Sequence, residues 1–348
     1  MSAEEIVIEE IPSEKEDEES EVPIYKIVSY PADLTLEILH KKWQRDEILV
    51  QSFQRGWVWK PKQASRLIDS FLLGLPVPAI FVYKEPSTEK WAIIDGQQRL
   101  RTVCGFFDGK LPDGSDFYLI GVTPKWEGMF YKDLKETDAR RLRDAVLRAV
   151  IVEQQDPKDD TSIYHIFERL NTGGTGLTPQ EVRNCVYHGP FNDFLRSLNK
   201  DVTWREIVGT NNPDPRMKDI ELIVRFLALL EGGASYFKPM KKFLSDYMSK
   251  HKNDTKQKPY HDAFLNAVSK VLKTLGPRPF HVRRGINIAV FDAVILAFAG
   301  ADSPPSNVKD RYQKLLRNPS FIDAISVHTT DVDRVKTRIK LAREILFK

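Results

Sequence analysis

The chain has 348 residues, 41% of them hydrophobic, which is enough for one large domain or two ordinary domains with packed cores. Its two cysteines, Cys104 and Cys185, lack the close spacing of a zinc site and are too few for a disulfide framework. No apolar run reaches the length of a membrane span and no signal-peptide pattern is present, so we expect a cytoplasmic protein.

The formal net charge is +3, but its sign is unevenly spread along the chain. Residues 1–22 hold ten acidic side chains against Lys15, which leaves 51 basic and 39 acidic residues in the remainder. We expect residues 1–22 to form a disordered acidic tail that keeps the protein soluble or shields a basic surface from nucleic acid.

The first half of the chain predicts alternating strands and helices. Residues 24–29 predict a strand, followed by a turn and a short helix over 31–39. Pro61 in a first-turn position, an apolar stripe to Leu72 and a stop at Gly74 predict a helix. The remaining expected elements are a hairpin over 78–83 and 91–94, a loop and a further strand within 111–121, helices over 100–107 and 138–147, and a strand over 149–153.

The second half of the chain has helical periodicity almost throughout. Helices are expected at 161–170, 178–187, 191–198, 218–230, 234–251, 260–275, 287–299, 308–316 and 332–346. The predicted fold class is therefore α+β, with a mixed α/β domain over 23–155 and an all-helical domain over 156–348.

The stretch Asp95-Gly96-Gln97-Gln98-Arg99 lies between the apolar run 91–94 and the next predicted helix. Gly96 permits a tight turn, after which backbone N–H groups and Arg99 can meet a phosphate at the helix N-terminus. Asp95 would repel that phosphate unless a divalent cation bridges the two or the acid orients a water, which indicates hydrolysis. The alternative is that Asp95 caps the helix and the next three residues form its solvated first turn.

Two further clusters combine arginine, amide and apolar side chains beside glycine. In residues 53–59, Arg55 can reach an anion while Trp57 and Trp59 line a pocket or stack on a base. The alternative is an aromatic edge of the core with Arg55 in a structural ion pair. In residues 167–176 the glycines permit close approach of a ligand to the backbone, and Glu168 and Asn171 can supply oxygen ligands to magnesium. The alternative is a plain interhelical loop.

Several motifs are missing from the sequence. Neither GxxxxGK[ST] nor GxGxxG occurs, so standard P-loop and Rossmann nucleotide binding are excluded. None of the seven histidines pairs with another, or with a cysteine, at metal-ligand spacing, so no HNH-type nuclease centre is visible. Two runs are rich in basic residues, 238–258 and 278–284, and the second includes Arg283 and Arg284. They can form a surface that binds DNA phosphate, or they can be solvated faces of helices.

The three clusters, in this order, resemble the N-terminal domain of GmrSD-type modification-dependent restriction enzymes, a family related in fold to ParB and sulfiredoxin. The resemblance covers residues 24–187 well and the helical remainder loosely. The motifs that carry it are Phe53-Gln54-Arg55 with Trp59, Ile68-Asp69-Ser70 with Leu75-Pro76-Val77-Pro78, Asp95-Gly96-Gln97-Gln98-Arg99, and Phe167-Glu168-Arg169-Leu170-Asn171-Thr172.

The resemblance implies a bacterial or archaeal domain that binds, and in several members hydrolyses, nucleoside triphosphates in defence against modified phage DNA. Carried over to this chain, it makes Asp95, Gln97, Gln98 and Arg99 the catalytic motif, with Gly96 at the turn. It further implies nucleotide binding by Gln54, Arg55, Arg169 and Asn171, and a magnesium ion held by Asp95 and Glu168. Family members often carry an HNH nuclease domain, so a separate HNH-type nuclease chain is the expected partner.

Three functions follow as expectations. The first is a nucleotide-binding, NTP-hydrolysing sensor or regulatory subunit of an anti-phage restriction system. The second is a non-catalytic module that binds modified DNA through Trp57, Trp59, Arg283 and Arg284, and the third is direct nuclease action by the ParB-like domain.

Overall fold

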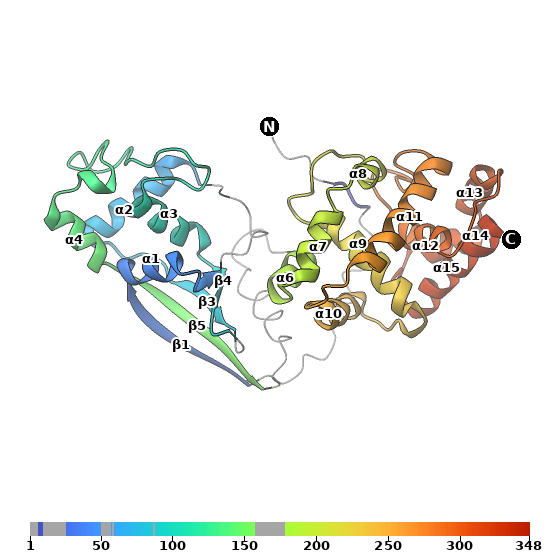
Figure 1. The fold of residues 1–348 in the computed structure, drawn as a ribbon, viewed down its shortest axis with the longest axis horizontal. Helices are drawn as coiled ribbons and strands as arrows, with labels where there is room; N and C mark the ends of the chain where they lie inside the picture. Colours follow the sequence, from blue (N-terminus) through green and yellow to red (C-terminus); the bar gives the residue numbers. More distant parts are fainter. Residues whose placement is uncertain (1–5, 10–25, 50–56, 58, 86–87, 157–177) are drawn as a thin grey trace. The chain divides into compact units, whose positions relative to one another are not determined.

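The structure, a computed structural model, describes residues 6–9, 26–49, 57, 59–85, 88–156 and 178–348 (Figure 1). The chain divides into two compact units. The mixed unit is residues 24–177, and the helical unit is residues 178–348 together with residues 1–23. The predicted boundary at 155/156 lies beside residues 157–177, outside the described part, and stays a prediction.

The mixed unit is built on one five-stranded sheet in the order β1-β5-β3-β4-β2. Pairs β1–β5 and β3–β4 are antiparallel, and pairs β3–β5 and β2–β4 are parallel. The strands are β1 (Lys26–Thr35), β2 (Ile48–Leu49), β3 (Ile80–Lys84), β4 (Trp91–Asp95) and β5 (Val146–Asp156). The predicted hairpin over 78–94 is thereby confirmed as β3 and β4.

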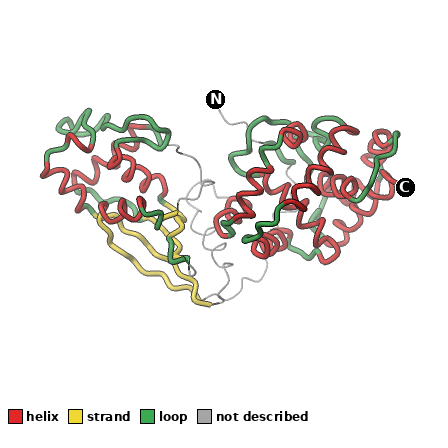
Figure 2. Tube along the Cα trace, in the orientation of Figure 1, coloured by secondary structure: helices red, strands yellow, loops and turns green. Residues whose placement is uncertain are grey.

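The helices of the mixed unit lie together on one side of this sheet (Figures 1 and 2). They are α1 (Leu36–Gln44), α2 (Pro61–Leu73), α3 (Gln97–Asp108) and α4 (Glu136–Asp144), with a 3-10 turn at Tyr131–Asp133. Alternate side chains of β5, such as Leu147 and Ala149, join the helices in the core, whereas Arg148 between them is exposed. The predicted helix from Pro61 to its stop at Gly74 is confirmed. Cys104 of α3 is buried in the core of this unit.

The strand expected within 111–121 is not formed; only an isolated bridge joins Lys110 and Asp116. Two predicted element boundaries in this unit are also wrong. The helix expected within 31–39 begins only at Leu36, because residues 26–35 pair with β5 along their whole length. Pro31 is tolerated there since β1 is an edge strand of the sheet. The helix expected over 138–147 ends at Asp144, and the next residues already belong to β5. In both places sheet pairing outweighs helical spacing.

The helical unit confirms the predicted helical second half. Its helices are α6 (Pro179–Val186), α7 (Pro190–Leu198), α8 (Val202–Val208), α9 (Lys218–Gly232), α10 (Met240–His251), α11 (Lys258–Leu275), α12 (Ile288–Ala299), α13 (Val308–Leu316), α14 (Pro319–Ser326) and α15 (Val332–Phe347), with a 3-10 turn at Gly233–Ser235. The short α8 and α14 were not predicted, and α10 begins six residues later than expected. The helix expected at 161–170 lies outside the described residues.

Helix α12 is the centre of the helical unit. Its residues from Ala289 to Phe298 are all buried, and it packs on α15, α11 and α9. Asp292 in this helix accepts hydrogen bonds from Arg225 of α9 and Arg338 of α15, with Nη2–Oδ2 distances of 2.6 and 2.8 Å. This buried charge cluster joins three helices at one point.

The expectation of a disordered tail over 1–22 is wrong for residues 6–9. Ile6 is only 2% exposed, and Ile8 forms a parallel β-bridge with Ile286 at the start of the helical core. The expectation of disorder follows from the charge of the tail. It does not take into account that Ile6 and Ile8, which are separated by one residue, can dock on the helical unit. Within the described part of the chain, no helix combines the length and apolar character needed to cross a membrane.

Candidate functional site

The predicted phosphate-type turn joins β4 to α3 in the mixed unit. Asp95 is the last residue of β4, and Gly96 is the N-cap of α3. Gly96 has φ 91° and ψ 13°, a left-handed conformation that favours glycine. A Cβ at this position would also overlap the side chain of Ile80 in β3. The tight turn predicted at Gly96 is therefore present.

An ion pair spans this turn. Arg99 Nη2 lies 2.9 Å from Asp95 Oδ2 and also donates to the Ala79 carbonyl, 3.0 Å away. The side chain of Arg99 is 18% exposed and that of Asp95 is 49% exposed. The Arg99 Nε atom is buried and has no hydrogen-bond partner among the described residues. The guanidinium is thus fixed through its Nη2 nitrogen, which bonds both Asp95 and Ala79.

The alternative explanation of this motif as an ordinary helix cap is wrong. Gly96, not Asp95, occupies the N-cap position, and the Asp95 carboxylate is directed to Arg99. Gln97 is 9% exposed, so the first turn of α3 is not simply solvated. Because Gly96 has no side chain, the cap residue itself supplies no acceptor for the first N–H groups of α3. A helix N-terminus whose cap residue supplies no side-chain acceptor can accommodate an anion at its first N–H groups.

The other predicted parts of the pocket fall outside the described residues. These are Gln54 and Arg55 in one segment and Glu168, Arg169 and Asn171 in another. Their approach to Arg99 therefore remains a prediction. The structure does bring Asp95, Gly96, Gln97, Gln98 and Arg99 together, because they are consecutive across one strand-to-helix turn.

The aromatic residues of the first cluster lie at the edge of the core. The rings of Trp57 and Trp59 have centroids 6.5 Å apart at 57°, and both side chains are half-buried against the core of the mixed unit. This position agrees with the alternative of an aromatic core edge. Both rings keep an exposed part, which leaves stacking on a base as a prediction.

A metal centre built only from the described protein side chains is not present. No group of three or more His, Cys, Asp or Glu side chains is placed to hold a metal ion in the described residues. The predicted ligand Asp95 keeps one carboxylate oxygen outside its ion pair with Arg99. Magnesium commonly takes one or two carboxylates together with phosphate oxygens and water, so the donor set fits such a shared ion.

Arg101 is a candidate that the sequence analysis missed. It lies two residues after Arg99 on α3 and is half-buried, and burial lowers the pKa of its guanidinium. No acidic partner for Arg101 occurs among the described residues. The signal for Arg101 in the sequence is the second arginine of the run Arg99-Leu100-Arg101.

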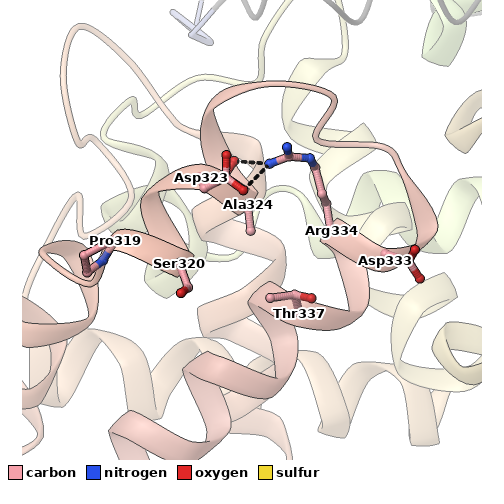
Figure 3. A pocket seen from close by; sticks show the side chains of 7 residues that line it. All are labelled: Pro319, Ser320, Asp323, Ala324, Asp333, Arg334 and Thr337. Carbon is pink, nitrogen blue, oxygen red and sulfur yellow. Dashed lines mark hydrogen bonds and ion pairs between the residues drawn. The ribbon is translucent and has the colours of Figure 1, made fainter.

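The predicted DNA-binding arginines lie in the helical unit. Arg283 and Arg284 are exposed in the turn before α12, and neither side chain has an acidic partner among the residues that the structure describes. The unit also has an open depression of about 500 Å³ between α14 and α15 (Figure 3). Its Arg334 is paired with Asp323 at 3.0 Å, so the depression offers no free cation from that side chain.

A search of curated proteins found no match to the chain. Residues 36–188 match the family model described as GmrSD restriction endonuclease, N-terminal domain. The matched range contains the β4–α3 turn and extends to the first helix of the helical unit. Residues 36–188 of this chain thus form a domain of the kind found at the N-terminus of GmrSD restriction endonucleases.

Proposed function

We propose that the mixed unit binds a nucleoside triphosphate at the β4–α3 turn and acts as a sensor or regulatory subunit of a restriction system. The observation that carries this proposal is Arg99, held by Asp95 and Ala79 through one nitrogen, with a buried Nε that lacks a partner among the described residues. A guanidinium positioned in this way at a helix N-terminus suits a phosphate group.

The ion pair also gives Asp95 two roles in the proposal. Its bond to Arg99 fixes the guanidinium beside the turn before any ligand arrives, which reduces the conformational entropy that binding costs. Its other carboxylate oxygen would hold a magnesium ion together with triphosphate oxygens. The ion supplies charge neutralisation, without which the carboxylate and the phosphate would repel each other.

Hydrolysis is the further step of the proposal. Asp95 is half-exposed, so it can orient a water molecule toward the γ-phosphate while Arg99 stabilises the charge on the phosphate oxygens. Gln97 and Gln98, which follow on the first turn, are proposed to orient the nucleotide. Gln54, Arg55, Arg169 and Asn171 complete the pocket in this proposal, and Glu168 is the second acidic ligand.

The family resemblance extends the proposal to partners and fold. We propose that the mixed unit is related in fold to ParB and sulfiredoxin, and that a separate HNH-type nuclease cleaves DNA when the nucleotide state permits. Co-purification of the full chain with the product of an adjoining nuclease gene tests this part.

The test of nucleotide binding uses the full chain with each of the four NTPs and magnesium. Calorimetry measures binding, and release of inorganic phosphate measures hydrolysis. We expect one or more NTPs to bind, and Asp95→Ala and Arg99→Ala to abolish binding or phosphate release. The proposal fails if neither activity is present, or if both variants equal the parent.

A second candidate is a module that binds modified DNA without turnover. The exposed parts of the half-buried Trp57 and Trp59 rings favour it, since such rings can stack on a base. A salt series separates the two functions, because DNA binding dominated by phosphate contacts weakens steeply with salt. Nucleotide binding in a formed pocket depends less on salt. Metal-dependent nicking abolished by Asp95→Ala would instead indicate nuclease action.

A further inference from the structure

The N-terminal segment of residues 6–9 lies on the helical unit, more than two hundred residues away in sequence. The Ile6 N–H donates to Asp214 Oδ2 at 2.6 Å, and Lys218 Nζ donates to the Ile6 carbonyl at 3.1 Å. Asp214 itself is only 3% exposed. A buried carboxylate oxygen that accepts a backbone N–H shows that this end of the segment is held specifically.

The middle of the segment pairs with the turn before α12 in the manner of an added strand. The Ile286 N–H donates to the Val7 carbonyl at 2.9 Å, and the Glu9 N–H donates to the Ile286 carbonyl at 3.1 Å. Val7 is exposed while Ile6 is buried, as the alternation of an extended chain requires. A Cβ at position 285 would overlap the Val7 carbonyl, so Gly285 leaves room for the segment.

The last described residue of the segment, Glu9, has both carboxylate oxygens engaged by this turn. The Arg283 N–H donates to Oε1 and Asn287 Nδ2 donates to Oε2, each at 2.8 Å. The Asn287 side chain also caps α12 through its Oδ1, so its amide is fixed in place. The turn over 283–287 therefore holds an anionic group with preformed donors.

The same turn carries exposed positive charge. Arg283 and Arg284 are both exposed and lack acidic partners in the described parts of the chain. A phosphate oxygen accepts hydrogen bonds from the same donors as a carboxylate oxygen, and two guanidinium groups beside it add charge attraction. Glu9 and a DNA phosphate would therefore compete for one place.

We propose that residues 6–9 form an autoinhibitory strap, whose Glu9 carboxylate occupies the donors of the 283–287 turn and keeps DNA phosphate from them. Release of the strap opens the turn and its two arginines to the DNA backbone. The binding is to phosphate and does not depend on base sequence. This inference goes beyond the proposed nucleotide binding and uses no residue of the mixed unit.

The test measures binding of the full chain, without nucleotide, to a short fluorescein-labelled DNA duplex by fluorescence polarisation over a salt series. Glu9→Gln removes the charge of the strap, and Gly285→Ala blocks its docking from the opposite side of the contact. Asp302→Asn is the matched control, because it removes one negative charge from an exposed position of the same unit.

We expect Glu9→Gln and Gly285→Ala each to tighten DNA binding by about tenfold. The reason is that the donors of the 283–287 turn, which Glu9 occupies in the parent, become open to a charged phosphate oxygen. The salt dependence should steepen by about one phosphate contact. Asp302→Asn should stay within about twofold of the parent, since screening weakens a lone surface charge. Adding Arg283→Gln and Arg284→Gln to Glu9→Gln should abolish the gain.

Three results would overturn the proposal. The first is equal DNA affinity for Glu9→Gln and Asp302→Asn, and the second is absence of DNA binding in every variant. The third is a gain that persists without the two arginines. If Gly285→Ala fails to fold, as circular dichroism would show, Glu9→Gln alone decides. Because no nucleotide is added, the outcome is independent of whether the mixed unit binds NTPs.

Discussion

Arg99 and Asp95 are joined across the β4–α3 turn by an ion pair of 2.9 Å between Nη2 and Oδ2. The pair places the Arg99 guanidinium beside the first N–H groups of α3. This relationship connects the fold of the mixed unit to its proposed nucleotide binding.

Arg99→Lys tests whether the guanidinium geometry matters beyond its charge. We expect NTP affinity to fall by about tenfold or more, because lysine cannot make the forked contact of arginine. Calorimetry with the preferred NTP measures the loss. Arg148→Lys is the matched control, since Arg148 forms an exposed bidentate pair with Asp33 on the sheet. Equal affinities of Arg99→Lys and the control would contradict the role of Arg99.

Gly96→Ala tests the backbone of the turn. Its positive φ and the overlap with Ile80 should destabilise the mixed unit by about 2–3 kcal/mol. Gly109→Ala at the other end of α3 has a similar φ of 72° but open space around it, and it should cost only about 1 kcal/mol. Urea unfolding of the full chain, followed by tryptophan fluorescence, compares the two. Equal losses would show that the contact with Ile80 is unimportant.

The contacts of Asp138 predict a pH-dependent contribution to the free energy of unfolding of the mixed unit. Hydrogen bonds from Lys125 Nζ and Trp126 Nε1 lower the pKa of its carboxyl below the ordinary value of 3.8. A lowered folded pKa contributes stability that is complete above the ordinary value and is lost as the pH falls through the folded pKa. The parent should thus exceed Asp138→Asn in stability at about pH 7, and the difference should shrink below about pH 4.

Urea midpoints of the parent and Asp138→Asn, measured at several pH values, check this expectation. Asp116→Asn serves as a control, because Asp116 pairs with Lys110 at an exposed site. A parent advantage that stays constant from neutral to acidic pH would rule out the proposed charge effect.

Asp292 tests the core of the helical unit. Asp292→Ala leaves Arg225 and the fully buried Arg338 without their carboxylate, which should cost about 3–5 kcal/mol. Asp246→Ala removes an exposed i,i+4 partner of Lys242 and should cost less than about 0.5 kcal/mol. Thermal unfolding measures both variants. A small effect of Asp292→Ala would mean that the cluster is not stabilising.

Local signals in the sequence predicted local structure well. Pro61 and Gly74 marked the ends of α2, and Gly96 marked the turn before α3, because each imposes a backbone conformation by itself. The full length of β1 was not predictable from its own residues. Its extended form depends on pairing with β5, more than a hundred residues later, and the local spacing of Leu34 and Ile38 indicated a helix instead.

The candidate site was predictable only in part for the same reason. The motif Asp95-Gly96-Gln97-Gln98-Arg99 marked the turn itself, whereas the ion pair between Asp95 and Arg99 was not predicted, because it depends on how the strand meets the helix. Docking of Ile6 and Glu9 on the turn before α12 depends on tertiary contacts, and a composition rule pointed to disorder. The meeting of the Gln54–Arg55 and Glu168–Asn171 segments with this turn lies outside the described residues and stays a prediction.

Hydrogen exchange of the full chain, with and without saturating NTP and magnesium, tests the central claim most directly. The proposal predicts slower exchange of the backbone amides of Gln97, Gln98 and Arg99 when the triphosphate is bound, and no such change in Arg99→Ala. Unchanged exchange at the β4–α3 turn, under conditions where calorimetry shows the nucleotide to be bound, would contradict the claim that this turn holds the phosphates.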